Sequence, residues 1–286
     1  MRRGARGIAG RESDLCSGIS PRPIRVRPMT PTHQRPKHAD EFIERCRGDV
    51  SRWLGIVHQM ALDDELFWQA NAVAAAHPAL RDRGNDLLAM LGSGYGHRTL
   101  VQLRAATDRS EGSVSVAGVL DALARNPACI PREWFVQLWL HEATAANRSR
   151  LEAMAHDAFT RTFEAGTADV IPAGVFERRR EKLIAELEKC TRYVRKRLAH
   201  FDRSASPDSP TFTEIRLGVR RVALEVRYLG LLLNGHSPGR IGPVRAYNWY
   251  DVLKFAWLAE DGHPPRVVTL DELRLPEEDP PEEASD

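Results

Sequence analysis

Apolar residues recur at helical spacing along almost the whole chain, and this feature most limits the folds open to it. The clearest stripe lies between Pro172 and His200, where apolar side chains follow one another at intervals of seven, four, three, four and four residues. Such spacing places them on one face of an α-helix. The stripe consists of Phe176, Leu183, Leu187, Cys190, Val194 and Leu198.

The same pattern predicts a series of helices. We expect them at about 39–62, 64–76, 132–165, 172–200 and 211–233, with a short helix after Ser115 and a helical pair interrupted at Gly92–Gly96. That glycine cluster is also typical of close helix packing. Ser115 is a good N-cap and Asn234-Gly235 a good helix end. The fold class is therefore predicted to be all-α, a bundle of long antiparallel helices.

Composition divides the chain into four parts. Residues 1–38 form an Arg- and Pro-rich basic arm, which we expect to be disordered, and residues 39–235 form the helical domain. Residues 236–275 form a linker and an aromatic segment expected to pack on that domain, and residues 276–286 an acidic disordered tail. The physiological start is either Met1 or Met29.

Several classes of protein are disfavoured. No apolar run approaches the ~20 residues of a membrane-spanning helix, and the four cysteines form no C-x-x-C pair. His141-Glu142 lacks a second histidine four residues on, and Gly92–Gly96 lacks the ending of a phosphate-binding loop. Asp63-Asp64-Glu65 is expected to be a solvated helix face. We therefore expect no metal, no cofactor, reduced thiols and a cytoplasmic protein.

The densest cationic cluster lies at the end of the predicted helix 172–200. It contains Arg192, Arg195, Lys196 and Arg197, and His200 and Arg203 follow. Cations at a helix C-terminus complement the helix dipole, so a purely structural role stays open. The same residue types suit cleavage of RNA by its own 2′-hydroxyl, which needs proton transfer and a cation near the phosphate.

Here the chain resembles the HEPN superfamily, and in particular its abortive-infection AbiU-type branch. HEPN nucleases have an arginine, four to six residues and then a histidine near a helix end, as in Arg195 and His200. Leu198–Asp202 is also similar to that branch, and Leu103–Arg109 followed by Ser113–Val116 resembles its acidic loop and short capped helix. Directly after the arginine, where the family commonly has Asn or Asp, this chain has Lys196.

The resemblance implies a metal-independent endoribonuclease acting in phage defence or as a toxin. Its catalytic residues would be Arg195 and His200, and its RNA-binding residues Arg192, Lys196, Arg197 and Arg203. Its partners would be RNA and a second copy of the chain, with an antitoxin protein as a further candidate. A non-catalytic helical module that binds RNA or a protein is the alternative, and a plain interaction domain is a third.

The spacing of Arg195 and His200 poses a geometric problem. Residues five apart diverge by roughly 140° on an ideal α-helix. Either the helix ends before His200, or two chains contribute to one site. An arginine and a histidine within the family's spacing range also occur at Arg150 and His156, with five residues between them, inside a predicted helix, and this pair is the main competitor.

Overall fold

A computed structural model describes residues 36–76, 85–110, 112–141, 143–198 and 208–236. Every named element in these ranges is a helix, and the β-pairing found there is an isolated bridge between Pro131 and Val170. The predicted helical bundle is confirmed. Residues 1–35 of the basic arm, the segment 237–275, the acidic tail and both candidate starts lie outside the described residues. Residues 36–38 of the arm form a turn that leads into the first helix, where the Ala39 amide donates to the Pro36 carbonyl oxygen at 2.9 Å.

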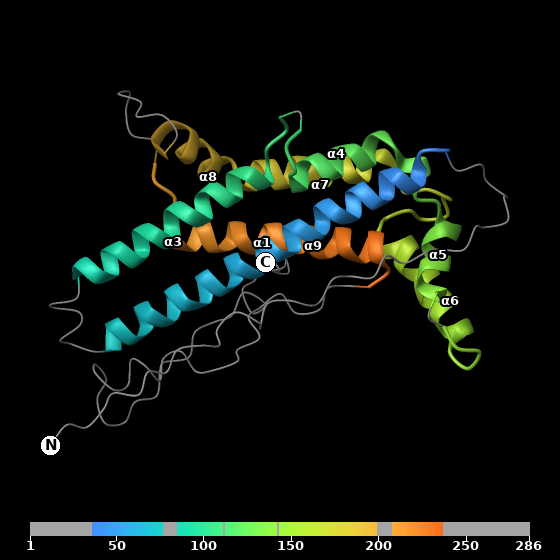
Figure 1. Cartoon of the computed structure of the whole chain (residues 1–286), viewed down its shortest axis with the longest axis horizontal. Coiled ribbons are helices and arrows are strands. Elements are labelled where there is room, and N and C mark those ends of the chain that lie inside the picture. The colour runs from blue at the N-terminus through green and yellow to red at the C-terminus, as the bar shows by residue number, and fades with distance from the viewer. Residues whose placement is uncertain (1–35, 77–84, 111, 142, 199–207, 237–286) are drawn as a thin grey trace, which may run out of the picture. The chain divides into compact units, whose positions relative to one another are not determined.

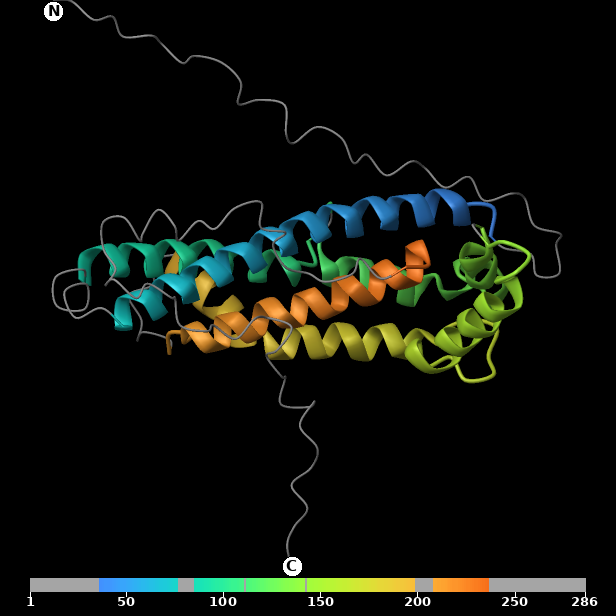
Figure 2. The same ribbon diagram turned by 90° about the horizontal axis from the view of Figure 1, so that it is seen from below.

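The longest helix, α1 (Ala39–Ala76), runs without interruption through the position where we expected a break. Leu62, Asp63 and Asp64 include no proline or glycine, so nothing in the backbone ends the helix there. Its buried face packs mainly against α9 and also against α3 and α4. Figures 1 and 2 show α1 running antiparallel to both α3 and α9.

The second long helix, α3 (Asn85–Ala106), is also continuous, so the predicted interruption at Gly92–Gly96 is wrong. The alternative, close packing, is confirmed. A β-carbon at Gly92 would lie 3.1 Å from Cζ of Phe212, and one at Gly96 would lie 3.5 Å from Cε1 of the same ring. The glycines let the first residue of α9 approach the backbone of α3.

The short helix α4 (Val116–Arg125) begins as predicted. The Ser115 hydroxyl accepts a hydrogen bond from the Gly118 amide at 2.9 Å and donates one to the carbonyl oxygen of Asp108. The 3₁₀ turn η1 (Pro127–Cys129) follows directly. Together these bonds fix the polar loop between α3 and α4.

The predicted single helix over 132–165 is wrong. The chain forms α5 (Arg132–Leu140), turns, and continues as α6 (Arg148–Asp157) and the π-helical segment η2 (Ala158–Thr162). The turn brings Phe135 to within 5.6 Å of Phe159 and 5.2 Å of Phe163, between ring centroids. A continuous helix would hold these rings far apart, so burial of the three rings favours the turn.

The predicted helix over 172–200 is likewise divided, into α7 (Ala173–Glu186), α8 (Glu188–Tyr193) and the π-helical segment η3 (Val194–Leu198). The division occurs at Leu187, which is fully buried. A β-carbon at Gly218 of α9 would come within 2.9 Å of Leu187 and of Leu103. Leu187 and α9 are thus in close contact at the point where the helix changes direction.

The last described helix, α9 (Phe212–Asn234), has the bounds that its caps predict. Thr211 and Glu214 form a reciprocal capping box, and Gly235 takes the left-handed conformation with φ of 72°. α9 contacts α1, α3 and α7, which makes it the centre of the bundle (Figure 2). Its buried apolar side chains are Ile215, Val219, Val222, Ala223, Val226, Leu229, Leu232 and Leu233.

Candidate nucleic-acid interface

The cationic cluster predicted from the sequence extends over α8 and η3, which lie beside α3 (Figure 1). The side chains of Arg192 and Arg195 are exposed, and those of Lys196 and Arg197 are half-buried. We call these four residues the cation cluster. The buried side chains of Cys190 and Val194 anchor the segment to the bundle. Among the described residues no carboxylate forms an ion pair with any of the four.

Arginines in the interior have a different environment. Arg216 Nε lies 3.0 Å from Asp64 Oδ2, and Arg179 Nε lies 2.8 Å from Glu225 Oε2. Arg221 Nε lies 3.1 Å from Glu186. These arginines are held by carboxylates and join α9 to α1 and α7.

The expectation that Asp63-Asp64-Glu65 is a solvated face is wrong for Asp64, which is fully buried. Its carboxylate accepts hydrogen bonds from Tyr95 Oη at 2.7 Å, Trp68 Nε1 at 3.2 Å and Arg216 Nε at 3.0 Å. Burial raises the pKa of Asp64, and Arg216 opposes this shift. Because all the donors come from the bundle interior, Asp64 has a structural role.

His200 and Arg203 lie outside the described residues, so the pairing of Arg195 with His200 stays a prediction. The segment that carries Arg195, η3, is π-helical as far as Leu198, and its hydrogen bonds join residues five apart. The divergence expected for an ideal α-helix therefore does not apply within η3.

The competing pair lies on α6, where Arg150 is exposed and His156 is half-buried. The carbonyl oxygen of His156 accepts a long hydrogen bond, 3.4 Å, from Arg132 Nη1. Arg132 also donates to Thr160 Oγ1 at 2.9 Å and to Gly166 O at 2.6 Å. Arg132 at the start of α5 is thus bonded to the backbone at His156 and to the segment that follows α6.

The loop that resembles the family's acidic loop is ordered by its own side chains. Asp108 Oδ1 accepts hydrogen bonds from the Ser110 amide at 2.9 Å and the Ser110 hydroxyl at 2.7 Å. These bonds lower the pKa of the Asp108 carboxyl. The carboxylate thus shapes the loop before α4.

The described part of the chain offers few side chains for metal binding or for reactions of a cysteine thiol. Within it, no group of three or more His, Cys, Asp or Glu side chains is placed to hold a metal ion. Cys46, Cys129 and Cys190 are buried there and form no disulfide with one another, and burial raises the pKa of Cys46 to about 12 and of Cys190 to about 11. None of the described helices combines the length and the apolar character that crossing a membrane requires.

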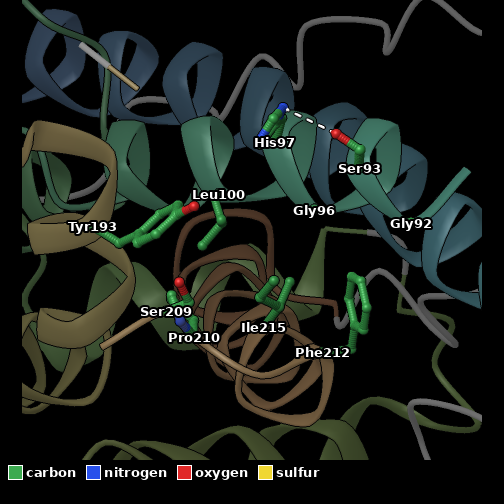
Figure 3. Close-up of a pocket in the computed structure, with 10 residues that line it drawn as sticks. All are labelled: Gly92, Ser93, Gly96, His97, Leu100, Tyr193, Ser209, Pro210, Phe212 and Ile215. Atoms are coloured by element: carbon green, nitrogen blue, oxygen red, sulfur yellow. Dashed lines mark hydrogen bonds between the residues drawn. The ribbon is translucent and has the colours of Figure 1, made fainter. Parts of the chain in front are cut away.

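A pocket of about 150 Å³ lies beside the cation cluster, between α3, Tyr193 of α8 and the start of α9 (Figure 3). Its lining residues are Gly92, Ser93, Gly96, His97, Leu100, Tyr193, Ser209, Pro210, Phe212 and Ile215. The sequence interpretation missed this pocket. Its signal was the pair of glycines four residues apart, which leaves one face of α3 without side chains.

Comparison with protein-family models, with curated proteins and with solved structures finds no match to this chain. The resemblance to the HEPN superfamily therefore rests on the motifs alone.

Proposed function

We propose that this chain is a metal-independent endoribonuclease of HEPN type that acts in the cytoplasm in phage defence or as a toxin. The observation that carries the proposal is the cation cluster. Three arginines and a lysine stand within six residues, and no described carboxylate neutralises them. Clustered cations without internal partners favour binding of a polyanion.

In the proposed mechanism Arg195 binds the scissile phosphate. Its planar guanidinium donates to two phosphate oxygens and stabilises the charge that grows as the 2′-hydroxyl attacks phosphorus. Arg192, Lys196, Arg197 and Arg203 hold the neighbouring phosphates. The 2′-oxygen to phosphorus bond forms as the bond to the 5′-oxygen breaks, and a 2′,3′-cyclic phosphate results.

His200 supplies proton transfer, because an imidazole titrates near neutral pH. One such histidine acts either as base for the 2′-hydroxyl or as acid for the leaving oxygen. A two-fold dimer would bring a second copy, so the proposal includes a shared site. Light scattering should then give about twice the 32.1 kDa chain mass. An antitoxin protein is a further proposed partner.

The test is incubation of the purified protein with mixed RNA in EDTA. Cleavage should persist, leave cyclic phosphate ends and spare a DNA copy of the substrate. His200→Ala and Arg195→Ala should each reduce the rate, by roughly 10²–10⁴-fold for the histidine. Arg178→Ala is the matched control for Arg195→Ala, because Arg178 is an exposed arginine that pairs with Glu164 on another surface.

His156→Ala tests the competing motif and should keep full activity. If it abolishes cleavage while His200→Ala does not, the active site belongs to α6. If no RNA is cut but RNA binds in an Arg195-dependent way, the chain is the non-catalytic RNA-binding module of the same architecture.

A further inference from the structure

The pocket beside the cation cluster has aromatic rings at both ends. Tyr193 closes it on the side of α8, and Phe212 closes it on the side of α9, with Leu100 and Ile215 between them (Figure 3). Phe212 is 40% exposed although its ring centroid lies 4.6 Å from that of Phe67. An exposed ring at the edge of a hollow is available for stacking.

The pocket size limits its ligand. About 150 Å³ is well below the ~300–1,000 Å³ of sites for drug-sized molecules and cofactors. An engineered apolar cavity of about this volume in another protein binds benzene. The pocket therefore suits one six-membered ring better than a fused double ring.

The rim of the pocket is polar. Ser93 and His97 of α3 are both exposed and lie 3.5 Å apart between Oγ and Nδ1, and the Ser209 hydroxyl lines the opposite side. These groups can exchange hydrogen bonds with the polar edge of a ring. A plain hydrocarbon would leave them unused.

The positive charge next to the pocket indicates that the ligand also carries a phosphate group. Lys196 and Arg197 follow Tyr193 by three and four residues in this helical segment, which places them on the same side of the segment as the Tyr193 ring. A pyrimidine nucleotide carries such a flat, polar-edged six-membered ring, joined to its phosphate through a ribose. Aromatic stacking of a base is worth about 1–3 kcal/mol in proteins that bind single strands.

We infer that this pocket binds the base of a pyrimidine nucleotide while the cation cluster binds its phosphate. The inference rests on the proposed function, since it names the nucleotide that the cleavage surface would prefer. A free nucleotide and a nucleotide within an RNA chain share this chemistry, and the experiment below distinguishes the two.

Two glycines of α3 provide a matched test. A β-carbon at Gly96 would lie 3.5 Å from Phe212 and 3.9 Å from Ile215, which is ordinary contact, so Gly96→Ala adds a methyl group to the pocket without moving the helix. A β-carbon at Gly94 would meet nothing within 4 Å. Gly94→Ala thus gives the same change in helix propensity and leaves the pocket open.

The measurement is fluorescence or calorimetric titration of the full chain with UMP, AMP, ribose 5-phosphate and a U-only RNA hexamer. UMP should bind at least about tenfold more tightly than AMP or ribose 5-phosphate. Gly96→Ala should weaken UMP binding by about tenfold, as expected for one methylene in a pocket, and Gly94→Ala should not. Tyr193→Leu, which removes the ring and keeps apolar bulk, should do the same as Gly96→Ala.

The RNA hexamer shows whether the pocket binds a nucleotide within an RNA chain or a free nucleotide. Binding of the hexamer well above that of UMP assigns the pocket to an RNA chain, whereas equal binding assigns it to a free nucleotide. Equal affinity for AMP and UMP, or equal effects of Gly96→Ala and Gly94→Ala on UMP binding, would refute the proposal that the pocket binds a pyrimidine base. Melting curves of all the variants separate loss of the site from loss of the fold.

Failure of the pocket and failure of the nuclease proposal give different results. UMP binding that is sensitive to Gly96→Ala, without any RNA cleavage, keeps the pocket and removes the nuclease. Cleavage without base preference, together with no UMP binding, keeps the nuclease and removes the pocket.

Discussion

Arginines of two regions of this bundle differ in what surrounds them. In the interior, Arg216, Arg179 and Arg221 each lie within 3.1 Å of a carboxylate oxygen. On α8 and η3, Arg192 and Arg195 are exposed, and no described acid pairs with them. The same side chain therefore holds helices together in one region and is available to a ligand in the other. The location of carboxylates, rather than the number of arginines, distinguishes the two.

The largest expected effect comes from breaking the most buried pair. Asp64→Ala leaves the guanidinium of Arg216 inside the bundle without its carboxylate, and breaking such a pair typically costs about 3–5 kcal/mol. The melting temperature should fall by roughly 10 °C. The double variant Asp64→Leu/Arg216→Met should recover part of this loss, because both charges are then absent, while the Tyr95 hydroxyl still lacks its acceptor. If Asp64→Ala melts like the wild type, the buried pair does not stabilise the fold.

A smaller loss is expected for Glu225→Gln. Glu225 is fully buried, and Arg179 lies over the Tyr228 ring with Cζ 3.6 Å from the centroid. However, Arg179 is one-quarter exposed, and Arg221 keeps its contact with Glu186. We therefore expect about half the effect of Asp64→Ala, measured by the same thermal unfolding. An equal or larger loss of stability would mean that the exposure of an ion pair does not determine how much the pair stabilises the fold.

An intermediate case is the half-exposed pair of Lys189 and Glu214, with Nζ 2.7 Å from Oε1. The Lys189 ammonium and the Thr211 amide lower the pKa of Glu214 below its usual 4.5. Its contribution is thus fully present above pH 4.5 and is lost as the pH falls through the lowered pKa. It should be below about 1 kcal/mol because water screens the pair. The difference in the free energy of unfolding between wild type and Glu214→Gln should be larger at pH 7 than at pH 3. A difference that grows on acidification contradicts this sign.

The smallest effect on stability is expected in the cation cluster. Arg195→Ala and Arg192→Ala should each change the free energy of unfolding by less than about 0.5 kcal/mol, because they are exposed and unpaired within the described structure. Their effect should appear in RNA binding, where the slope of log K against log salt should fall by about 0.7 for each phosphate that the variant no longer neutralises. Arg178→Ala should leave this slope unchanged. A stability loss without any change in slope would make the cluster structural.

Helix content and helix ends were largely predictable because their signals are local. Ser115 and Asn234-Gly235, the predicted cap and the predicted helix end, lie at the start of α4 and at the end of α9. The Thr211–Glu214 capping box at the start of α9 is equally local, although it was not among the predicted signals. The cation cluster was visible for the same reason, since its residues are adjacent in the chain.

Breaks inside the predicted helices were not predictable, because their causes lie far away in sequence. The turn after α5 depends on Phe135 meeting Phe159 and Phe163, and the break at Leu187 lies where that side chain meets α9. Conversely, Leu62–Asp64 stays helical with Asp64 bonded to Tyr95 and Arg216, and Gly92–Gly96 stays helical where Phe212 packs against Gly92 and Gly96. Tertiary contacts outweigh propensity differences of less than about 1 kcal/mol per residue.

From the sequence alone, this chain is a helical bundle with defined caps and one dense group of cations, since periodicity, capping and adjacency are properties of short segments. The tertiary structure decided which charges are enclosed and which are left exposed. Asp64 is 152 residues from Arg216 and 31 from Tyr95, and Gly96 meets Phe212 only through the crossing of α3 and α9. Burial, ion pairing and the pocket beside Tyr193 all depend on such distant contacts, which no local pattern encodes.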